Sequence, residues 1–240
     1  MHFERMAAEY AQARPPYPQP IFETLEAASV IGPGLRILEI GAGAGLATEE
    51  LTRRGCDVVA LEPGAQLSAL LMESLPGVEV LVARLEDAEL PDHGFDSVVA
   101  ATSMHWVDLR VGLPKIHAAL RPDGCLAVWR TIFGDEEVET DFRARVIQLV
   151  SQREDDEDTR REHRPTMEEL TAGDWFEPVQ TEQWHWSVNL STDQIRRLFA
   201  TFSNWSPAEV SAAAQAADDL GGFVTEHYRS VLHLLRRRRG

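Results

Sequence analysis

Three glycines and two glutamates occur at a spacing that suits the binding of a nucleoside. Gly41, Gly43 and Gly45 follow an apolar segment that ends at Ile40, and Glu62 ends the next apolar segment. Glycine has no Cβ, so a ligand can approach its backbone closely, and a helix that begins after such a turn offers unpaired N–H groups. A carboxylate at the tip of the second strand has two oxygens for the hydroxyls of a ribose. The segment therefore predicts a site for a nucleoside-containing cofactor.

The residues around the glycines distinguish two classes of cofactor. In the dinucleotide-binding fingerprint, the third glycine stands where this chain has Leu46. Glu39 precedes the first glycine by two residues, and it would repel a pyrophosphate because like charges in a partly desolvated crevice oppose each other. It suits the sulfonium and ammonium of S-adenosylmethionine. We therefore predict S-adenosylmethionine as the cofactor and S-adenosylhomocysteine as its product. A tight turn without a ligand is the alternative interpretation.

The elements that must position these residues alternate between strands and helices. Short apolar runs predict strands at 35–40, 57–62, 78–82, 95–101 and 124–131, and amphipathic segments predict helices at 44–54, 65–75 and 109–120. This alternation is typical of an α/β protein with a parallel sheet and helices on both faces. In such sheets, ligands bind outside the carboxyl ends of the strands.

The two ends of the chain differ from this pattern. Helices are expected at about 3–12 and 20–30, and another from Asp135 to about Val150. Capping boxes begin at Thr166 and Ser206, and apolar alternation predicts a strand near 184–190 and a last one at 226–235. We expect a single domain of residues 1–240, with N-terminal lid helices at 1–34, a cofactor-binding core at 35–131, and a cap with the last strands at 132–240.

Five motifs follow one another between residues 35 and 130. They are I-L-E-I-G-A-G-A-G at 37–45, A-L-E-P at 60–63, L-E-D-A-E-L-P at 85–91, G-F-D-S-V-V at 94–99 and L-R-P-D-G-C-L-A-V at 120–128. Their order resembles that of the class I S-adenosylmethionine-dependent methyltransferases. Two further runs, Y-A-Q-A-R-P-P-Y-P at 10–18 and M-H-W-V-D at 104–108, are similar to a bacterial, type 11-like subgroup that acts mostly on small molecules. The resemblance implies a Rossmann-like sheet of seven strands, mostly parallel with the last one antiparallel. It also implies that the N-terminal helices and an insertion after the fifth strand form a lid.

The predicted cofactor site follows from the glycine segment and from this resemblance. Glu62 is expected to accept hydrogen bonds from the ribose hydroxyls, and Glu86 resembles the acid that takes the adenine amino group, with the Asp87 N–H facing the ring. The apolar faces of the adenine are assigned to Pro63 and Leu85. The full predicted set comprises Glu39, Gly41, Ala42, Gly43, Gly45, Glu62, Pro63, Leu85, Glu86, Asp87, Thr102, Ser103 and Trp106.

The predicted acceptor site lies after the strand that begins at Phe95. His105 can remove a proton from a hydroxyl or amine because the usual pKa of histidine is near neutrality, although a packing role is an equal alternative. On the expected lid, Arg14 can clamp a carboxylate, or its proline-rich segment can serve only as a tether. Catalytic roles are assigned to His105, Tyr10 and Arg14, and contacts with the acceptor to Tyr17, His105, Trp106 and Trp184.

The composition and net charge of the chain argue against several classes of function. The net charge of −16 argues against nucleic acid or an anionic membrane as the main partner. The sequence has no 18-residue apolar run, no signal-peptide layout and no Cys/His metal spacing, so we expect a cytoplasmic protein with a small-molecule substrate, either a monomer or a homodimer. One alternative function is an NAD(P)-dependent oxidoreductase, although Lys115, the only lysine, lacks a tyrosine at the Tyr-x-x-x-Lys offset. A cofactor-binding protein without turnover is the other.

Overall fold

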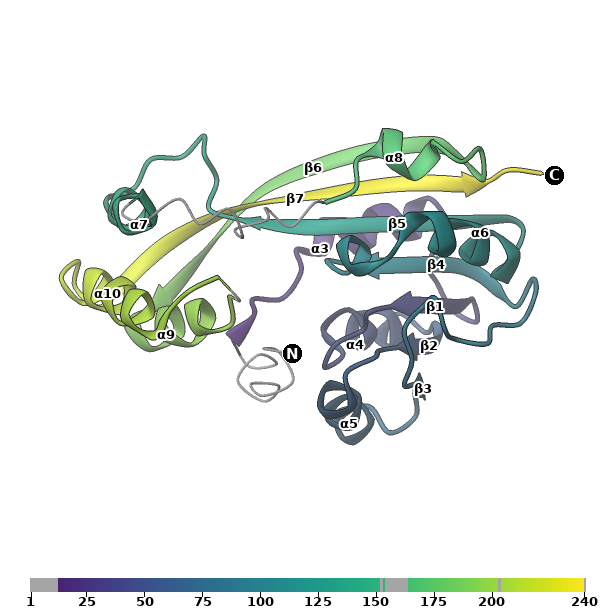
Figure 1. The fold of residues 1–240 in the computed structure, drawn as a ribbon, viewed down its shortest axis with the longest axis horizontal. Helices are drawn as coiled ribbons and strands as arrows, with labels where there is room; N and C mark the ends of the chain where they lie inside the picture. Colours follow the sequence, from purple (N-terminus) through teal and green to yellow (C-terminus); the bar gives the residue numbers. More distant parts are fainter. Residues whose placement is uncertain (1–12, 152, 154–163, 203, 240) are drawn as a thin grey trace. The chain divides into compact units, whose positions relative to one another are not determined.

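The computed structural model describes residues 13–151, 153, 164–202 and 204–239, which form two compact units (Figure 1). The larger unit holds the described residues 16–131, 164–184 and 230–239. The smaller unit holds the remaining described residues, namely 13–15, 132–151, 153, 185–202 and 204–229. The predicted helix at 3–12 lies outside the described residues. The single-domain organisation, with its lid and cap, stays a prediction.

The sheet has seven strands in the order β3-β2-β1-β4-β5-β7-β6. Its strands are β1 (Arg36–Ile40), β2 (Asp57–Leu61), β3 (Glu79–Leu81), β4 (Phe95–Ala101), β5 (Leu120–Phe133), β6 (Phe176–Ser191) and β7 (Phe223–Arg237). The pairs β1–β2, β1–β4, β2–β3 and β4–β5 are parallel, and the β7 arrow points the opposite way to the β4 arrow (Figure 1). This mixed, Rossmann-like sheet confirms the predicted fold class.

The direction of strand addition reverses between β1 and β4. From β1 the chain adds β2 and then β3 on one side, whereas β4 and β5 follow on the other side of β1. Helices that connect strands added in opposite directions pack on opposite faces of the sheet. In such sheets, ligands bind in the crevice at the point where the strand order reverses. The carboxyl ends of β1 and β4, at Ile40 and Ala101, lie at this point of reversal.

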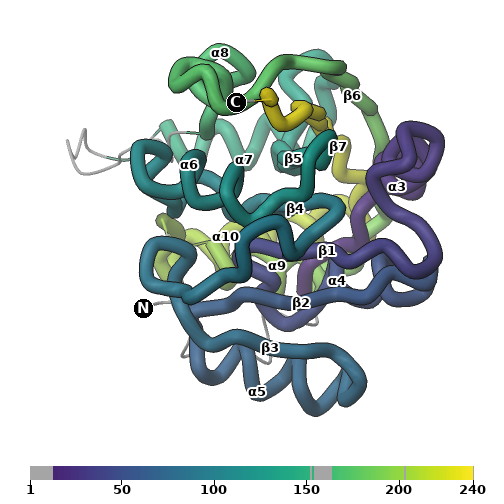
Figure 2. Tube along the Cα trace, turned by 90° about the vertical axis from the view of Figure 1, so that its right-hand side faces the viewer, coloured from purple at the N-terminus to yellow at the C-terminus, as the bar shows by residue number. Residues whose placement is uncertain are grey.

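Alternating residues of the larger unit's strands pack into two cores, one on each face. Ile37, Val99 and Trp129 belong to a core with α3 (Gln19–Ala27) and α4 (Leu46–Arg53). Leu38 and Val98 belong to a core with α6 (Leu109–Ala119) and α8 (Met167–Thr171). Figure 2 shows α3 and α6 on opposite sides of the sheet. Because these strands are buried on both faces, their sequences are continuous apolar runs. Helix α5 (Ala65–Ser74) follows β2.

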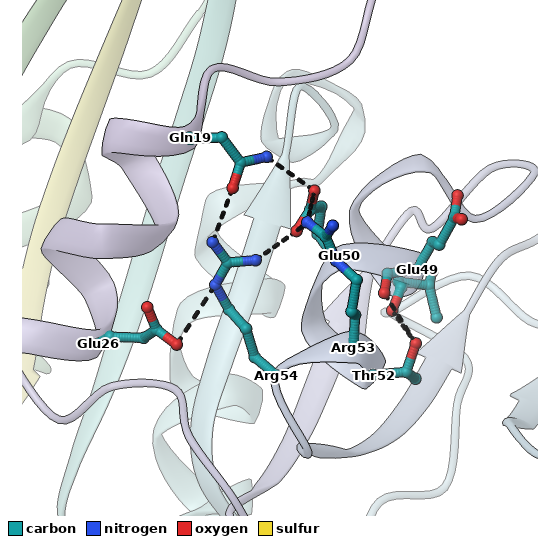
Figure 3. Close-up of polar contacts among 8 residues, drawn as sticks. Gln19, Glu26, Glu49, Glu50, Thr52, Arg53 and Arg54 are labelled. Atoms are coloured by element: carbon teal, nitrogen blue, oxygen red, sulfur yellow. Dashed lines mark hydrogen bonds and ion pairs between the residues drawn. The ribbon is translucent and has the colours of Figure 1, made fainter.

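A polar network holds α3 against α4, the helix that follows the glycines (Figure 3). The Gln19 side chain donates to Glu50 and accepts from Arg54, both at 2.8 Å. Arg54 also pairs with Glu26 at 3.4 Å and with Glu50 one helical turn earlier. The side chains of Arg54 and Glu50 are only 13% and 15% exposed, so the network fixes the orientation of α4 against α3.

The smaller unit has an aromatic core built on three helices. These are α7 (Asp141–Ser151), α9 (Thr192–Ala200) and α10 (Pro207–Asp218). They pack around Phe142, Phe199 and Tyr228. The capping boxes at Thr166 and Ser206 are confirmed at the starts of α8 and α10, and a third, Ser191 with Gln194, begins α9, which the sequence did not predict.

The predicted helix from Asp135 starts later, at Asp141. The Asp135 carboxylate accepts a hydrogen bond from the Glu137 N–H at 3.1 Å, and its own N–H donates to the His227 carbonyl at 2.8 Å. A side chain bonded to the backbone two residues on favours a turn over a helix. The helix begins instead where Thr140 Oγ1 accepts from the Arg143 N–H at 3.0 Å.

Three strands are longer than predicted. The predicted strands at 124–131, 184–190 and 226–235 are parts of the longer strands β5, β6 and β7. Within the described ranges, none of the helices is long and apolar enough to span a membrane.

Candidate active site

The glycine turn, Gly41 to Gly45, links the end of β1 to α4. All three of its glycines have positive φ, at +67°, +60° and +98° for Gly41, Gly43 and Gly45. The N–H groups of Gly41 and Ala42 donate to the Leu61 carbonyl at 2.7 and 3.2 Å, which ties the turn to the end of β2. Gly45 caps α4 without a side-chain acceptor. The first N–H groups of α4 are therefore positioned to meet an anionic group of a ligand.

Glu62 joins the end of β2 to the glycine turn. Its side chain is 6% exposed. One carboxylate oxygen accepts from the Gly43 N–H at 2.9 Å, and the other accepts from the Gly64 N–H at 2.7 Å. These bonds fix the orientation of the carboxylate. The structure thus brings Glu62 and the glycines together, as the sequence predicted.

Glu39 is a buried acid within β1. It is 1% exposed, and the Thr48 hydroxyl donates to it at 2.7 Å. Removal from water raises the pKa of Glu39 to about 8, and the neighbouring Glu62 carboxylate acts in the same direction. At neutral pH this side chain is therefore mostly protonated, and a cation placed next to it would favour its ionised form.

The end of β4 contacts the glycine turn. The Ser103 hydroxyl donates to the Ile40 carbonyl, and a Cβ at Gly41 would lie 2.5 Å from the Ser103 Cβ. Thr102 has a positive φ of 56°, and the Tyr17 hydroxyl donates toward its Oγ1 at 3.2 Å. The predicted Gly41, Thr102, Ser103 and Tyr17 therefore lie together at the point where the sheet order reverses.

The predicted adenine contacts differ in exposure. Glu86 accepts hydrogen bonds from the Asp108 N–H at 3.0 Å and from the Arg84 side chain at 3.3 Å. Burial raises the pKa of Glu86, but these hydrogen bonds outweigh burial and hold the pKa below its usual range. Leu85 is 3% exposed and packs in a core, whereas Pro63 and Asp87 are exposed. The Asp108 partner lies 22 residues away in sequence, so local spacing could not indicate it.

His105 and Trp106 lie on a short 3₁₀ helix, η1 (Met104–Trp106). Their ring centroids are 4.7 Å apart, and Trp106 is 58% exposed. Beside them is a hollow of about 20 Å³ whose polar lining comes from Thr102, Ser103, His105, Arg130, Arg164 and His233. The last three side chains were not predicted as site residues because they come from separate segments of the chain.

Comparison with known proteins agrees with this geometry. A family model described as a methyltransferase domain matches residues 38–128. A protein of Mycobacterium bovis named as an uncharacterized methyltransferase is 32% identical over 213 residues, which cover 88% of this chain and 81% of that protein. The chain belongs to the class I S-adenosylmethionine-dependent methyltransferases.

Solved methyltransferases share the fold. A proposed type II methyltransferase of Anaeromyxobacter dehalogenans is 22% identical, with a TM-score of 0.62, and the match covers 93% of this chain and 97% of that one. A geranyl diphosphate methyltransferase in complex with S-adenosylmethionine is 17% identical, with a TM-score of 0.52, and the match covers 95% and 85% of the two chains.

Three residues that were predicted for the acceptor side, Tyr10, Arg14 and Trp184, lie in different parts of the chain. Tyr10 lies outside the described residues. The Arg14 guanidinium carbon lies 4.8 Å from the ring centroids of both Phe133 and Phe202 in the smaller unit, a cation–π arrangement. Trp184 packs against a core of the larger unit. The catalytic and acceptor-binding roles of these residues stay predictions.

The methyltransferase also gathers Asp135, Glu137 and His185 in its smaller unit, with one possible ligand atom of each within 4.8 Å of the others. The His185 Nδ1 lies 2.5 Å from one Asp135 oxygen, and the Glu137 N–H donates to the other. Hydrogen bonds within the chain therefore account for this cluster.

Proposed function

We propose that this methyltransferase transfers the methyl group of S-adenosylmethionine to a small organic acceptor by in-line displacement. The observation that supports this most strongly is the Glu62 carboxylate held on the Gly43 N–H, with the buried Glu39 in the adjacent strand. The glycine turn offers N–H groups to the carboxylate of the cofactor. The Glu62 carboxylate opposes a diphosphate, and Glu39, which is mostly protonated without ligand, can ionise beside a cationic adenosyl compound.

Four residues of the site have a proposed contact with the cofactor. Glu62 accepts hydrogen bonds from the ribose hydroxyls. Glu39 lies toward the sulfonium and ammonium end. The exposed Asp87 and Pro63 meet the adenine. Glu86 and Leu85 are engaged with Asp108 and with the core, and they shape the loop that carries Asp87. The bound S-adenosylmethionine of the geranyl diphosphate methyltransferase supports this choice of cofactor.

Positioning accounts for most of the expected catalysis. When bound, the sulfonium supplies an electrophilic methyl group, and the protein has to align the acceptor with it and exclude water. Alignment of this kind contributes up to about 7–11 kcal/mol of barrier lowering. Ser103 lies against the glycine turn and also lines the hollow, which supports an acceptor bound on the side of Ser103 away from Gly41. His105 lines the same hollow and is the proposed base.

The proposal is tested by measuring S-adenosylhomocysteine formation from S-adenosylmethionine with a library of small phenols, amines and carboxylic acids. Saturable product formation that depends on the acceptor supports the proposal. Tight cofactor binding with no turnover on any acceptor would identify a non-catalytic protein of the same fold. A thermal shift with NAD and none with S-adenosylhomocysteine would contradict the cofactor assignment.

Cofactor affinity should rise with pH because of Glu39. Without ligand, this carboxyl is protonated below its pKa of about 8, and a cation beside it favours ionisation, so binding releases a proton. Affinity for S-adenosylmethionine should therefore increase between pH 6 and 8, by at most about tenfold per unit, and level off above. Calorimetry at pH 7 in buffers of different ionisation enthalpy measures the released proton. Glu39→Gln should abolish this release, and a buffer-independent heat for the unmodified protein would contradict the assignment.

His105→Gln should lower kcat by about 10²-fold or more if His105 is the general base. Affinity for S-adenosylhomocysteine should change little, because the ring lines the hollow beside the turn. The measurement is the pH profile of kcat for both proteins on the best acceptor found. An unchanged kcat with an unchanged profile would leave His105 with a packing role against Trp106.

A further inference from the structure

The hollow beside His105 has an unusual charge for this chain. The chain has 39 acidic and 23 basic residues, apart from its histidines. The described residues that line the hollow nevertheless include Arg130, Arg164, His105 and His233, and none of the lining residues is an aspartate or glutamate. In a protein of net charge −16, a lining of this kind favours an anion over a cation or a neutral group.

Two of these basic residues, Arg130 and His233, are held by hydrogen bonds to the surrounding chain. Arg130 lies on β5, directly after the fully buried Trp129, and its Nη1 donates to the Arg164 carbonyl at 3.3 Å. On β7, His233 has its Nδ1 3.1 Å from the Thr181 hydroxyl. Burial lowers the pKa of His233, and the Arg130 charge lowers it further, so the positive field of the arginine reaches that ring.

The hollow adjoins the proposed methyl donor site. Ser103 is part of its lining and also contacts the glycine turn, since a Cβ on Gly41 would lie 2.5 Å from the Ser103 Cβ. A group held in the hollow is therefore separated from that turn by one residue. The volume of about 20 Å³ suits a small planar group, because a site of about 10–15 Å³ already holds one water.

We propose that the methyl acceptor is an organic anion, best a carboxylic acid, whose carboxylate is bound in this hollow by Arg130 and Arg164. A guanidinium presents a planar fork of donors that matches a carboxylate. The carboxylate would fix the acceptor at one end, and the rest of the molecule would extend past His105. This inference rests on the proposed function, because it names the class of acceptor for the same site.

The test measures binding of matched anionic and neutral probes by calorimetry, with the protein saturated with S-adenosylhomocysteine. Benzoate is compared with benzamide, and acetate with acetamide, since each pair differs little except in charge. We expect each acid to bind at least tenfold more tightly than its amide. Phenyl phosphate is added to distinguish the two anion classes, and we expect it to bind more weakly than benzoate. Tighter binding of phenyl phosphate would overturn the assignment to a carboxylate.

Substitutions of the arginines test whether benzoate binds in the hollow. Arg130→Gln should weaken benzoate binding at least tenfold, and Arg130→Lys should weaken it less because the charge is kept while the fork is lost. Arg121→Gln is the matched control: it lies on the same strand, is paired with Asp96 outside the hollow, and should leave benzoate binding unchanged. If Arg130→Gln does not fold, Arg164→Gln is used in its place.

The outcomes separate the two proposals. Equal binding of acid and amide, or unchanged benzoate binding in both arginine variants, overturns the anionic acceptor while S-adenosylhomocysteine still binds. Failure of S-adenosylhomocysteine to bind the unmodified protein instead overturns the proposed function.

Discussion

Glu62→Gln is expected to weaken S-adenosylhomocysteine binding by about 10- to 100-fold. Each hydrogen bond from a ribose hydroxyl to a carboxylate contributes about 1.5–3 kcal/mol, and a glutamine has one acceptor oxygen in place of two. The substitution also turns an NH₂ group toward either the Gly43 or the Gly64 N–H, both of which now donate to the carboxylate. Calorimetric titration of the purified variant measures the loss.

The control for this prediction is Glu73→Gln. Glu73 is an exposed acid on α5 in the same unit, so its substitution changes the net charge by the same amount away from the turn. Urea unfolding of both variants shows whether the fold is kept. A folded Glu62→Gln protein with unaltered affinity would disprove the ribose assignment.

Gly41→Ala is expected to destabilise the protein by about 2–5 kcal/mol. A side chain at positive φ costs about 1–2 kcal/mol, and a Cβ here would meet the Ser103 Cβ at 2.5 Å. Ser103 cannot easily move away because it is buried and its hydroxyl is bonded to the Ile40 carbonyl. Forcing a methyl group into such a contact adds about 1–3 kcal/mol. Urea unfolding without ligand measures the sum.

Gly43→Ala measures the cost of a side chain at positive φ without a clash with Ser103. Gly43 has a similar φ of +60°, but a Cβ there has no atom within 4 Å. This variant should therefore lose only about 1–2 kcal/mol. Equal losses for the two alanine variants would show that the contact between the glycine turn and Ser103 is not as close as described.

The site at the glycine turn could be predicted because its signals are local. Glycines at alternate positions after one apolar run, and an acid at the end of the next, indicate a strand, a turn and a strand end without further information. The topology then brings Glu62 to Gly43, since parallel strands β1 and β2 end at the same edge. Capping boxes at Thr166 and Ser206 are also local signals, and both are confirmed.

Features that depend on distant residues could not be predicted in the same way. Helix α7 begins later than predicted because Asp135 is hydrogen-bonded to the backbone of Glu137 and of His227. The second bond requires β7 to lie nearby. Likewise, Arg130 on β5 meets His233 because β7 lies beside β5, and Arg164 joins them from the segment before α8. No spacing in the sequence relates three residues from segments so far apart in the chain.

Titration of the intact protein with S-adenosylhomocysteine and, separately, with NAD tests the central claim most directly. That claim is that the crevice at Gly41–Gly45 and Glu62 takes a cationic adenosyl donor. Calorimetry should show one saturable site for S-adenosylhomocysteine and no measurable heat for NAD at the same concentrations. Saturable binding of NAD, with none of S-adenosylhomocysteine, would contradict the account.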